Sequence, residues 1–226
     1  VVKYEAPIPA ELQGLRKGNF PVDIPKTDET RVQSIPGVLE RQQDELFYVT
    51  EKVDGTSITI FYDNEAGELH VAGRTIDWDR ASDNSYWKNA LAAGFEEKGK
   101  TMGDIVLQGE LVGEGIQGNK LKIKGQKILF FNAMHRTTGE YMDYQDFVDY
   151  CSDLGVETVP VLRTDFSIKG MTVDQIVEMA TAKSVINPEA WVEGIVFRPM
   201  HERRDPKIGR VSFKAINPKF LLKYEE

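Results

Sequence analysis

The chain has 226 residues, of which 41% are hydrophobic and 28% charged, a balance that supports a sizeable core and excludes wholesale disorder. No window approaches about 18 consecutive apolar residues, so a membrane span is not expected. The single cysteine, Cys151, excludes an internal disulfide and a multi-cysteine zinc site. We therefore expect one domain over residues 1–226 in a reducing intracellular compartment, cytoplasmic or nuclear.

The formal net charge of −8 at first argues against a polyanionic partner. The charge is unevenly distributed, however, because residues 198–223 hold eight basic residues against two acidic ones, a local balance of +6. A second basic cluster, with four lysines and no acid, spans residues 120–127. Such runs are often only solvated faces, but two of them on an acidic chain also fit a surface that contacts phosphates.

The first 45 residues contain five prolines among many charged residues and predict an extended, irregular lead-in. The pattern then predicts, in chain order, strands at 47–53 and 57–62, a turn at 63–67, a strand at 69–72, a helix at 85–98, strands at 105–112 and 127–133, helices at 143–154 and 172–185, and strands at 191–198 and 210–216. Strands grouped in hairpins, with helices that do not alternate one for one, predict an α+β fold of antiparallel sheets flanked by helices.

Several residues are expected to begin or end these helices. Asn84 or Ser85 is the expected cap of the first helix and Gly99 its stop. Gly155 closes the second helix, and residues 172–175, Thr-Val-Asp-Gln, have the spacing of a capping box at the start of the third.

Two patterns that suggest binding sites lack the context that such sites need. Residues 113–118 match G-x-G-x-x-G, but residues 119–124 alternate like a strand and do not open a helix, so a flexible loop is favoured over a dinucleotide site. The three histidines, His70, His135 and His201, show no metal-ligand spacing.

A candidate reactive lysine, Lys52, lies in the sequence Thr-Glu-Lys-Val-Asp-Gly-Thr-Ser between two predicted strands. Five further short motifs follow it in order: Arg74 in Ala72-Gly73-Arg74-Thr75, Glu110 in Gly109-Glu110-Leu111, Phe131 in Leu129-Phe130-Phe131-Asn132, Glu193 in Glu193-Gly194-Ile195-Val196, and Lys214 in Ser212-Phe213-Lys214-Ala215-Ile216. Each residue alone has an ordinary interpretation, as a surface lysine, an edge-strand carboxylate or a core aromatic. The ordered set is what points to chemistry.

This ordered set resembles the covalent nucleotidyltransferase superfamily of polynucleotide ligases and RNA-capping enzymes, from about Thr27 to the C-terminus. The resemblance implies an ATP-grasp-like ligase domain in which Lys52 is the nucleophile, with Glu193 and Lys214 as further catalytic residues. DNA ligases and capping enzymes usually carry an arginine two residues after the glycine of the first motif. Here Thr56-Ser57 follows that glycine, which is similar to ATP-dependent RNA ligases that seal RNA nicks in repair.

Three alternatives remain open at this stage. One is a related DNA ligase or GTP-dependent capping guanylyltransferase, and another is a non-catalytic RNA-binding module that keeps the fold. The third is a sensor that binds a small nucleotide reversibly and releases no pyrophosphate. Residues 25–33 and the ending Phe220-Leu221-Leu222-Lys223 are similar to the branch with an OB-type domain ahead of the nucleotidyltransferase domain. Such a domain is therefore expected outside this chain.

The resemblance also implies roles for individual residues. The implied nucleotide-binding residues are Arg31, Glu51, Lys52, Gly55, Ser57, Arg74, Glu110, Phe131, Glu193 and Lys214. Phe131 is expected to stack on the base and Glu51 to accept a hydrogen bond from the adenine amino group. ATP, with Mg²⁺ or Mn²⁺, is the expected cofactor set, and RNA or an RNA/DNA nicked duplex with a 3′-hydroxyl and a 5′-phosphate is the expected partner of a monomeric enzyme.

The expected chemistry restricts what the acids can do. An amine near the reference lysine pKa of about 10.4 is only ~0.1% neutral near neutral pH, so a lysine nucleophile needs cations nearby, here Mg²⁺ and Lys214. A carboxylate in direct contact with Lys52 would hold its proton. Asp54, Glu110 and Glu193 are therefore expected to act on metal-bound water and on the ribose.

Two positions depart from the family pattern. Asn132 replaces the aspartate that usually follows the stacking aromatic residue, and Ile216 replaces the second lysine of the last motif. Arg210, Lys26 and Arg31 are the candidates to substitute for that lysine.

Overall fold

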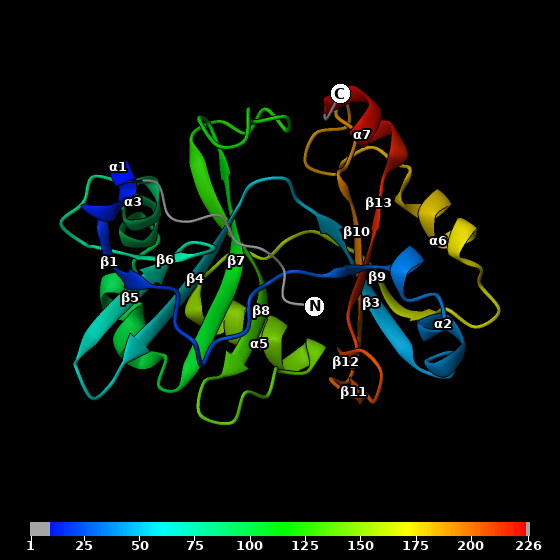
Figure 1. Ribbon diagram of the computed structural model, residues 1–226, viewed down its shortest axis with the longest axis horizontal. Helices are drawn as coiled ribbons and strands as arrows, with labels where there is room; N and C mark the ends of the chain where they lie inside the picture. Colours follow the sequence, from blue (N-terminus) through cyan, green and yellow to red (C-terminus); the bar gives the residue numbers. More distant parts are fainter. Residues whose placement is uncertain (1–9, 225–226) are drawn as a thin grey trace.

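Two β-sheets, each with helices packed against it, form the part of the chain that the computed structural model describes, residues 10–224 (Figure 1). The six-stranded sheet has the order β1-β6-β5-β4-β7-β8, and all its neighbouring strands are antiparallel. Its strands are Arg16–Asn19 (β1), Thr56–Asp63 (β4), Glu68–Ala72 (β5), Ile76–Trp78 (β6), Ile105–Gly113 (β7) and Gln126–His135 (β8).

The second sheet has five strands in the order β2-β13-β10-β3-β9. Its strands are Thr30–Arg31 (β2), Leu46–Lys52 (β3), Val161–Ser167 (β9), Gly194–Pro199 (β10) and Phe213–Ile216 (β13). Only β2 runs parallel to its neighbour, β13, within this sheet. A small ribbon of Arg204–Asp205 (β11) and Gly209–Arg210 (β12) adjoins the sheets. The predicted α+β class with antiparallel sheets is confirmed.

The helices are short. They are Ala10–Gln13 (α1), Val38–Arg41 (α2), Ser85–Ala92 (α3), Phe95–Lys98 (α4), Tyr144–Leu154 (α5), Val173–Ala180 (α6) and Pro218–Tyr224 (α7), with single 3-10 turns at Val32–Ser34 and Gly99–Thr101. Among the described residues, none of these helices has the length and apolar character needed to cross a membrane.

Each sheet has its own hydrophobic core. Helices α3, α4 and α5 place Trp87, Phe95 and Phe147 against the six-stranded sheet. Helices α2 and α6 pack on the five-stranded sheet, where Phe197 and Phe213 stack with ring centroids 5.0 Å apart. Burial of one such side chain stabilises the fold by roughly 1.5–3 kcal/mol. The two cores therefore stabilise the two sheets that flank the junction.

A smaller apolar cluster lies where the two sheets meet. It consists of Val53, Val112, Leu121, Leu129, Val159 and Ala190. Val53 belongs to the short connection between β3 and β4, which carries the chain from one sheet into the other. The reactive-lysine motif therefore lies at the junction of the two sheets.

The predicted helix at 85–98 is divided in two, which the sequence pattern did not indicate. Gly94 adopts a left-handed conformation with φ of 82° and separates α3 from α4, because a residue without a Cβ makes that turn at little cost. The predicted stop is confirmed, since α4 ends at Lys98 with Gly99 as its C-cap, and a 3-10 turn follows from Gly99. The predicted cap is confirmed, since the Asn84 side chain accepts a hydrogen bond from the Trp87 amide.

The predicted helix at 172–185 begins as expected but ends early. Thr172 and Gln175 form the capping box, whereas the helix stops at Ala180. Beyond it, Ser184 and the Val185 amide turn toward the buried carboxylate of Glu51, a tertiary contact that a continued helix would prevent.

The interpretation of residues 119–124 as strand-like is also wrong. These residues lie in the loop between β7 and β8, residues 114–125, where Asn119 and Lys122 have positive φ values. A positive φ is incompatible with a β-strand. The expectation of a loop at the G-x-G-x-x-G run is confirmed, and whether that loop is flexible remains a prediction.

Candidate active site

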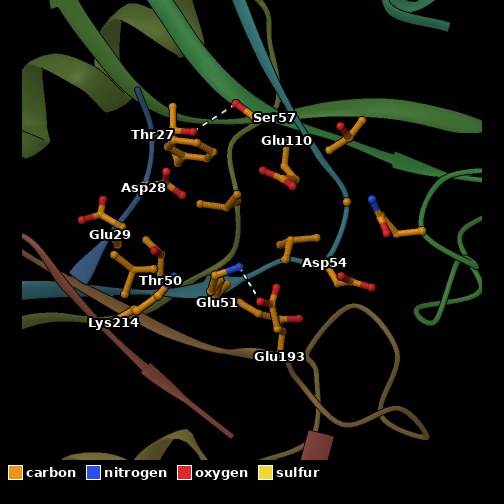
Figure 2. Close-up of a pocket in the computed structure, with 18 of the residues that line it drawn as sticks. Thr27, Asp28, Glu29, Thr50, Glu51, Asp54, Ser57, Glu110, Glu193 and Lys214 are labelled. Carbon is orange, nitrogen blue, oxygen red and sulfur yellow. Dashed lines mark hydrogen bonds and ion pairs between the residues drawn. The ribbon is translucent and has the colours of Figure 1, made fainter. Parts of the chain in front are cut away.

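A cavity of about 470 Å³ lies at the junction of the two sheets, within the usual size range of ligand pockets (Figure 2). Strands β3, β10 and β13 form one wall, and β4, β7 and β8 form the other. The segment 27–29 also reaches into it. Every sequence-predicted site residue except Arg31 lines this cavity, namely Glu51, Lys52, Asp54, Gly55, Ser57, Arg74, Glu110, Phe131, Glu193 and Lys214.

Lys52 and Glu193 form an ion pair in the cavity. Antiparallel pairing of β3 with β10 sets Lys52 opposite Gly194, which brings Glu193 beside the lysine. The Lys52 Nζ lies 2.6 Å from Glu193 Oε1, and the two side chains are 25% and 15% exposed. The strand register and the opposite charges thus place the two groups in direct contact, and the predicted action of Glu193 on metal-bound water and the ribose remains a prediction.

The surroundings of Glu193 both raise and lower its pKa. Burial raises the pKa of Glu193, and the neighbouring charge of Lys52 and the hydrogen bond from it oppose that increase. The charge of Asp54 adds to the increase. Glu193 is therefore a stronger base than an exposed glutamate.

Glu110 is the most strongly perturbed acid of the cavity. It lies on β7, opposite Ser57 of β4. The pKa of Glu110 is raised to about 8, mainly by burial; the charge of Lys52 opposes the increase, and the charges of Glu193 and Asp54 add to it. Near neutral pH the Glu110 carboxyl is therefore largely protonated in this state of the protein.

Lys214, on β13, is the second cation of the cavity. Burial lowers the pKa of Lys214, and the positive charge of Lys52 lowers it further. The predicted catalytic role of Lys214 remains a prediction.

Gly55 allows the β3–β4 turn to lie directly on β7. A Cβ at this position would be 2.5 Å from the Leu111 carbonyl oxygen and 2.7 Å from Val112 Cγ1, closer than side-chain atoms normally approach. The close approach sets the end of β3, with Lys52, against the strand that carries Glu110. Gly55 therefore has a structural reason for its place in the motif.

Asp54 is bound to a lysine of the β7–β8 loop. Its Oδ2 accepts a hydrogen bond of 2.8 Å from the Nζ of Lys120. The same ammonium lies 5.1 Å from the centre of the Phe220 ring, so it connects the motif to helix α7. Asp54 lines the cavity, and its predicted action on metal-bound water remains a prediction.

The acids of the cavity suit a cation that keeps its water. In the part of the chain that the structure describes, no group of three or more His, Cys, Asp or Glu side chains is placed to hold a metal ion. Glu110 and Glu193 have raised pKa values, and each owes part of the increase to other acids of the cavity. A divalent cation bound through water would relieve that repulsion, and Mg²⁺ usually keeps several waters.

The base-stacking candidate, Phe131, lies near a buried arginine that the sequence analysis did not include in the site. The guanidinium of Arg198 is 5.4 Å from the Phe131 ring centre and donates a 2.9 Å hydrogen bond to Glu29. Arg198 is 2% exposed, and its Nε and Nη1 have no hydrogen-bond partner within the described residues. The available signal was its position, two residues after the Glu-Gly-Ile-Val motif.

Glu51 has a structural role that the sequence did not reveal. It is 2% exposed, and its two carboxylate oxygens accept hydrogen bonds from Ser184 Oγ at 2.5 Å and the Val185 amide at 2.9 Å. Burial raises the pKa of Glu51, and these two bonds oppose the increase. Its predicted hydrogen bond to adenine remains a prediction.

The remaining predicted residues lie toward the outside. Arg74 and Asp28 form an exposed ion pair of 2.7 Å. Ser57 shares a 3.0 Å hydrogen bond with Thr27, which Figure 2 shows. Arg31 is exposed on β2, paired in register with Lys214 but outside the cavity lining. Its predicted contact with the nucleotide remains a prediction.

Arg210 is not positioned to replace the missing second lysine. Its guanidinium bonds to Glu202 and to Asn132, and it lies 3.5 Å from the ring centre of Tyr141. These contacts keep it out of the lining of the active-site cavity. Asn132, the other departure from the family pattern, thus serves as a neutral acceptor for Arg210. Lys26 and Arg31 also lie outside the lining of the active-site cavity, so which residue takes the place of the second lysine remains a prediction.

Comparisons with known proteins agree with the geometry and the motif order. A sequence model of the RNA ligase family matches residues 45–216, whereas the comparison with curated protein sequences found no match. The fold is that of a covalent nucleotidyltransferase. Within that superfamily, the chain belongs to the RNA ligase family.

Solved structures of an RNA ligase from Naegleria gruberi resemble the whole described fold. An unliganded variant gives a TM-score of 0.85 at 31% identity, over 99% of this chain and 64% of that one. The ligase with pyrophosphate gives 0.83 at 33% identity, over 99% and 65%. A variant with ATP and Mn gives 0.85 at 31% identity, over 100% and 65%. This chain thus spans slightly less than two thirds of the length of the ligases that it matches.

Proposed function

We propose that this chain is the nucleotidyltransferase domain of an ATP-dependent RNA ligase. Lys52 takes AMP from ATP, the AMP passes to the 5′-phosphate of an RNA end, and a 3′-hydroxyl then displaces AMP to form the phosphodiester bond. The observation that carries this proposal is the Lys52 amine, which lies in one cavity with Glu193, Glu110 and Lys214. The Naegleria structures with ATP and with pyrophosphate support it.

In the first step, the Lys52 Nζ attacks the α-phosphorus of ATP. A P–N bond forms, the bond between the α-phosphorus and the bridging oxygen breaks, and pyrophosphate leaves with the electron pair. The Nζ must lose a proton for this attack. Glu193, at 2.6 Å and with its pKa raised by burial, is positioned to accept that proton. Lys214 supplies positive charge for the phosphate oxygens.

The acids of the cavity would hold a divalent metal ion through water. Asp54, Glu110 and Glu193 are oxygen donors of the kind that Mg²⁺ and Mn²⁺ accept, and two of them carry raised pKa values that a cation would lower. When bound, such an ion neutralises charge on the phosphate oxygens. One of the Naegleria structures holds Mn together with ATP.

The later steps would use the same cavity and a nucleic-acid partner. A nicked RNA or RNA/DNA duplex with a 3′-hydroxyl and a 5′-phosphate fits the two reacting ends, and sealing of RNA nicks in repair is the corresponding role. We expect a monomeric enzyme that works with an OB-type domain outside this chain. The basic residues of the stretch 198–223 would contact phosphates of the duplex.

The proposal is tested by incubating the chain with α-labelled ATP and Mg²⁺, then denaturing it in detergent at neutral pH, because the P–N bond of a lysyl-AMP is labile in acid. We expect covalent label on the denatured wild type and none on Lys52→Met. Lys124→Met, which replaces an exposed lysine of the β7–β8 loop, is the matched control and should label normally. Label retained on Lys52→Met would refute the assignment of the nucleophile.

The same assay separates the alternatives. Labelling by GTP in preference to ATP would indicate a capping guanylyltransferase, and sealing of DNA nicks in preference to RNA nicks would indicate a DNA ligase. A chain that binds RNA but never acquires label would be a non-catalytic module.

A further inference from the structure

An aromatic side chain flanked by two lysines lies beside the active-site motif. The Nζ of Lys183 is 4.0 Å from the centre of the Trp191 ring, and the Nζ of Lys219 is 4.7 Å from it. Lys183 and Trp191 face each other across an antiparallel bridge, and Lys219 belongs to helix α7. Trp191 is half-buried, while both lysines are exposed.

One buried side chain fixes this arrangement. Asn217 is 0% exposed, and its Nδ2 donates hydrogen bonds to the carbonyl oxygens of Ala182 at 3.3 Å and Val192 at 3.0 Å. Its Oδ1 accepts a 2.9 Å bond from the Lys219 amide. The start of α7 and both ends of the segment 182–192 are therefore joined at one point, so the two lysines keep their places around Trp191.

Among the described residues, the two lysines beside Trp191 have no acidic partner, whereas the neighbouring Lys120 and Lys122 are paired with Asp54 and Glu189. Within residues 10–224, neither Lys183 nor Lys219 has a carboxylate at ion-pair distance, and Lys183 donates only to the main-chain oxygen of Glu189. The two basic stretches found in the sequence also meet here. Lys120 lies over the Phe220 ring of α7, and Lys122 approaches Glu189 at 3.4 Å between two largely exposed side chains.

The surface is linked through the chain to residues of the active-site wall. Trp191 precedes Glu193 by two residues, and the segment 182–192 contains Ser184, which holds Glu51 next to Lys52. A strand whose end reacts at Lys52 has to leave the cavity past one of its edges. At this edge it would find cations for its phosphates and the face of an indole ring for a base.

We propose that Lys183, Trp191 and Lys219 bind the RNA strand whose 5′-phosphate is activated at Lys52, which rests on the proposed ligase function. The lysines contact backbone phosphates, and a base near the strand end stacks on Trp191 in place of one ammonium. The surface selects a polynucleotide over a free nucleotide, and it takes no part in the transfer of AMP from ATP to Lys52.

The test measures RNA binding and self-adenylylation separately. The variants are Lys183→Gln/Lys219→Gln, Trp191→Leu, and Trp191→Phe, which keeps an aromatic face. Binding of a 5′-phosphorylated oligoribonucleotide is followed by fluorescence anisotropy at several salt concentrations, and sealing is followed with a nick already carrying a 5′-adenylate. The control Lys88→Gln/Lys169→Gln removes two exposed lysines that pair with Asp83 and Asp44 elsewhere on the molecule.

We expect the double lysine variant to bind RNA about tenfold more weakly. The slope of log K against the logarithm of the salt concentration should become smaller in magnitude by about 1.4, because each of two lost phosphate contacts to a single strand contributes about 0.7. Trp191→Leu should weaken binding and sealing about tenfold, and Trp191→Phe should restore most of both. Self-adenylylation with ATP should be unchanged in all variants, as should every measurement on the control.

The outcomes that overturn this proposal differ from those that overturn the ligase function. Unchanged RNA binding and sealing in the double lysine variant, with self-adenylylation intact, would show that the surface serves another purpose, such as contact with a second protein domain. Loss of self-adenylylation in these variants would show that the residues belong to the nucleotide site. A wild type that never forms an adenylate would instead refute the proposed function.

Discussion

Replacement of Glu110 by glutamine is expected to stabilise the protein against unfolding at alkaline pH. Glutamine has nearly the shape of a protonated glutamate and cannot ionise. The cavity holds the Glu110 carboxyl mainly in its protonated form, because burial raises its pKa from 4.5 to about 8. Above that pH the wild type has to carry a mostly buried carboxylate, and the variant does not.

The size of the effect follows from proton linkage. Between the unfolded pKa of 4.5 and the folded pKa of about 8, the native state binds more protons than the unfolded state, so the free energy of unfolding falls as pH rises. At about 1.4 kcal/mol per pKa unit, the full loss is about 5 kcal/mol. About 3 kcal/mol of it falls between roughly pH 5.5 and pH 8.5.

Urea unfolding of the wild type and Glu110→Gln at those two pH values measures this loss. The stability advantage of the variant should be about 3 kcal/mol larger at the higher pH. Glu114→Gln is the control, because Glu114 is exposed in the adjoining loop and its replacement should leave the pH dependence unchanged. A Glu110→Gln advantage that is the same at both pH values would refute the reasoning, since it would mean that Glu110 ionises equally in the folded and unfolded chains.

Three further predictions concern residues that shape the site. Gly55→Ala should lower the free energy of unfolding by about 2–3 kcal/mol in urea, because its Cβ would meet the Leu111 carbonyl oxygen at 2.5 Å. Ser184→Ala should cost about 1–3 kcal/mol on the same measure and increase amide exchange in residues 181–186, because it removes a hydrogen bond from the buried carboxylate of Glu51. Asn217→Ala should leave two carbonyl oxygens without their donor and cost about 1–3 kcal/mol, whereas Asn187→Ala should cost less.

The site was predictable from the sequence because its residues lie in short motifs tied to strands. The sequences around Lys52, Glu110 and Glu193 have the hydrophobic patterns of strands. Pairing of β3 with β10 then places Lys52 beside Glu193. Pairing of β4 with β7 places Ser57 beside Glu110. The order of the motifs therefore indicated that their residues lie close together in the fold, which no single motif could indicate.

The errors occurred where a tertiary contact decides the local structure. Residues 181–185 continue a helical pattern, but the need of the Glu51 carboxylate for donors ends the helix at Ala180. Arg198 was not included in the site because an arginine on a strand is ordinarily exposed, whereas this one is buried beside Phe131 and paired with Glu29. Neither partner is near in sequence, so no local pattern could have indicated these contacts.

The ion pair between Lys52 and Glu193 narrows the possible ways of activating the nucleophile. The contact sets the amine beside a carboxylate, and Lys214 is a second cation of the same cavity. An arriving triphosphate brings several negative charges, which favour an ammonium still further. Lys52 can therefore become a neutral amine only if additional positive charge enters the cavity with the nucleotide. That positive charge would draw Glu193 away from the lysine or reduce the negative charge around it. ATP without a divalent cation should accordingly bind to this cavity and leave Lys52 unlabelled, and labelling in the presence of a strong chelator would show that Glu193 and Lys214 suffice.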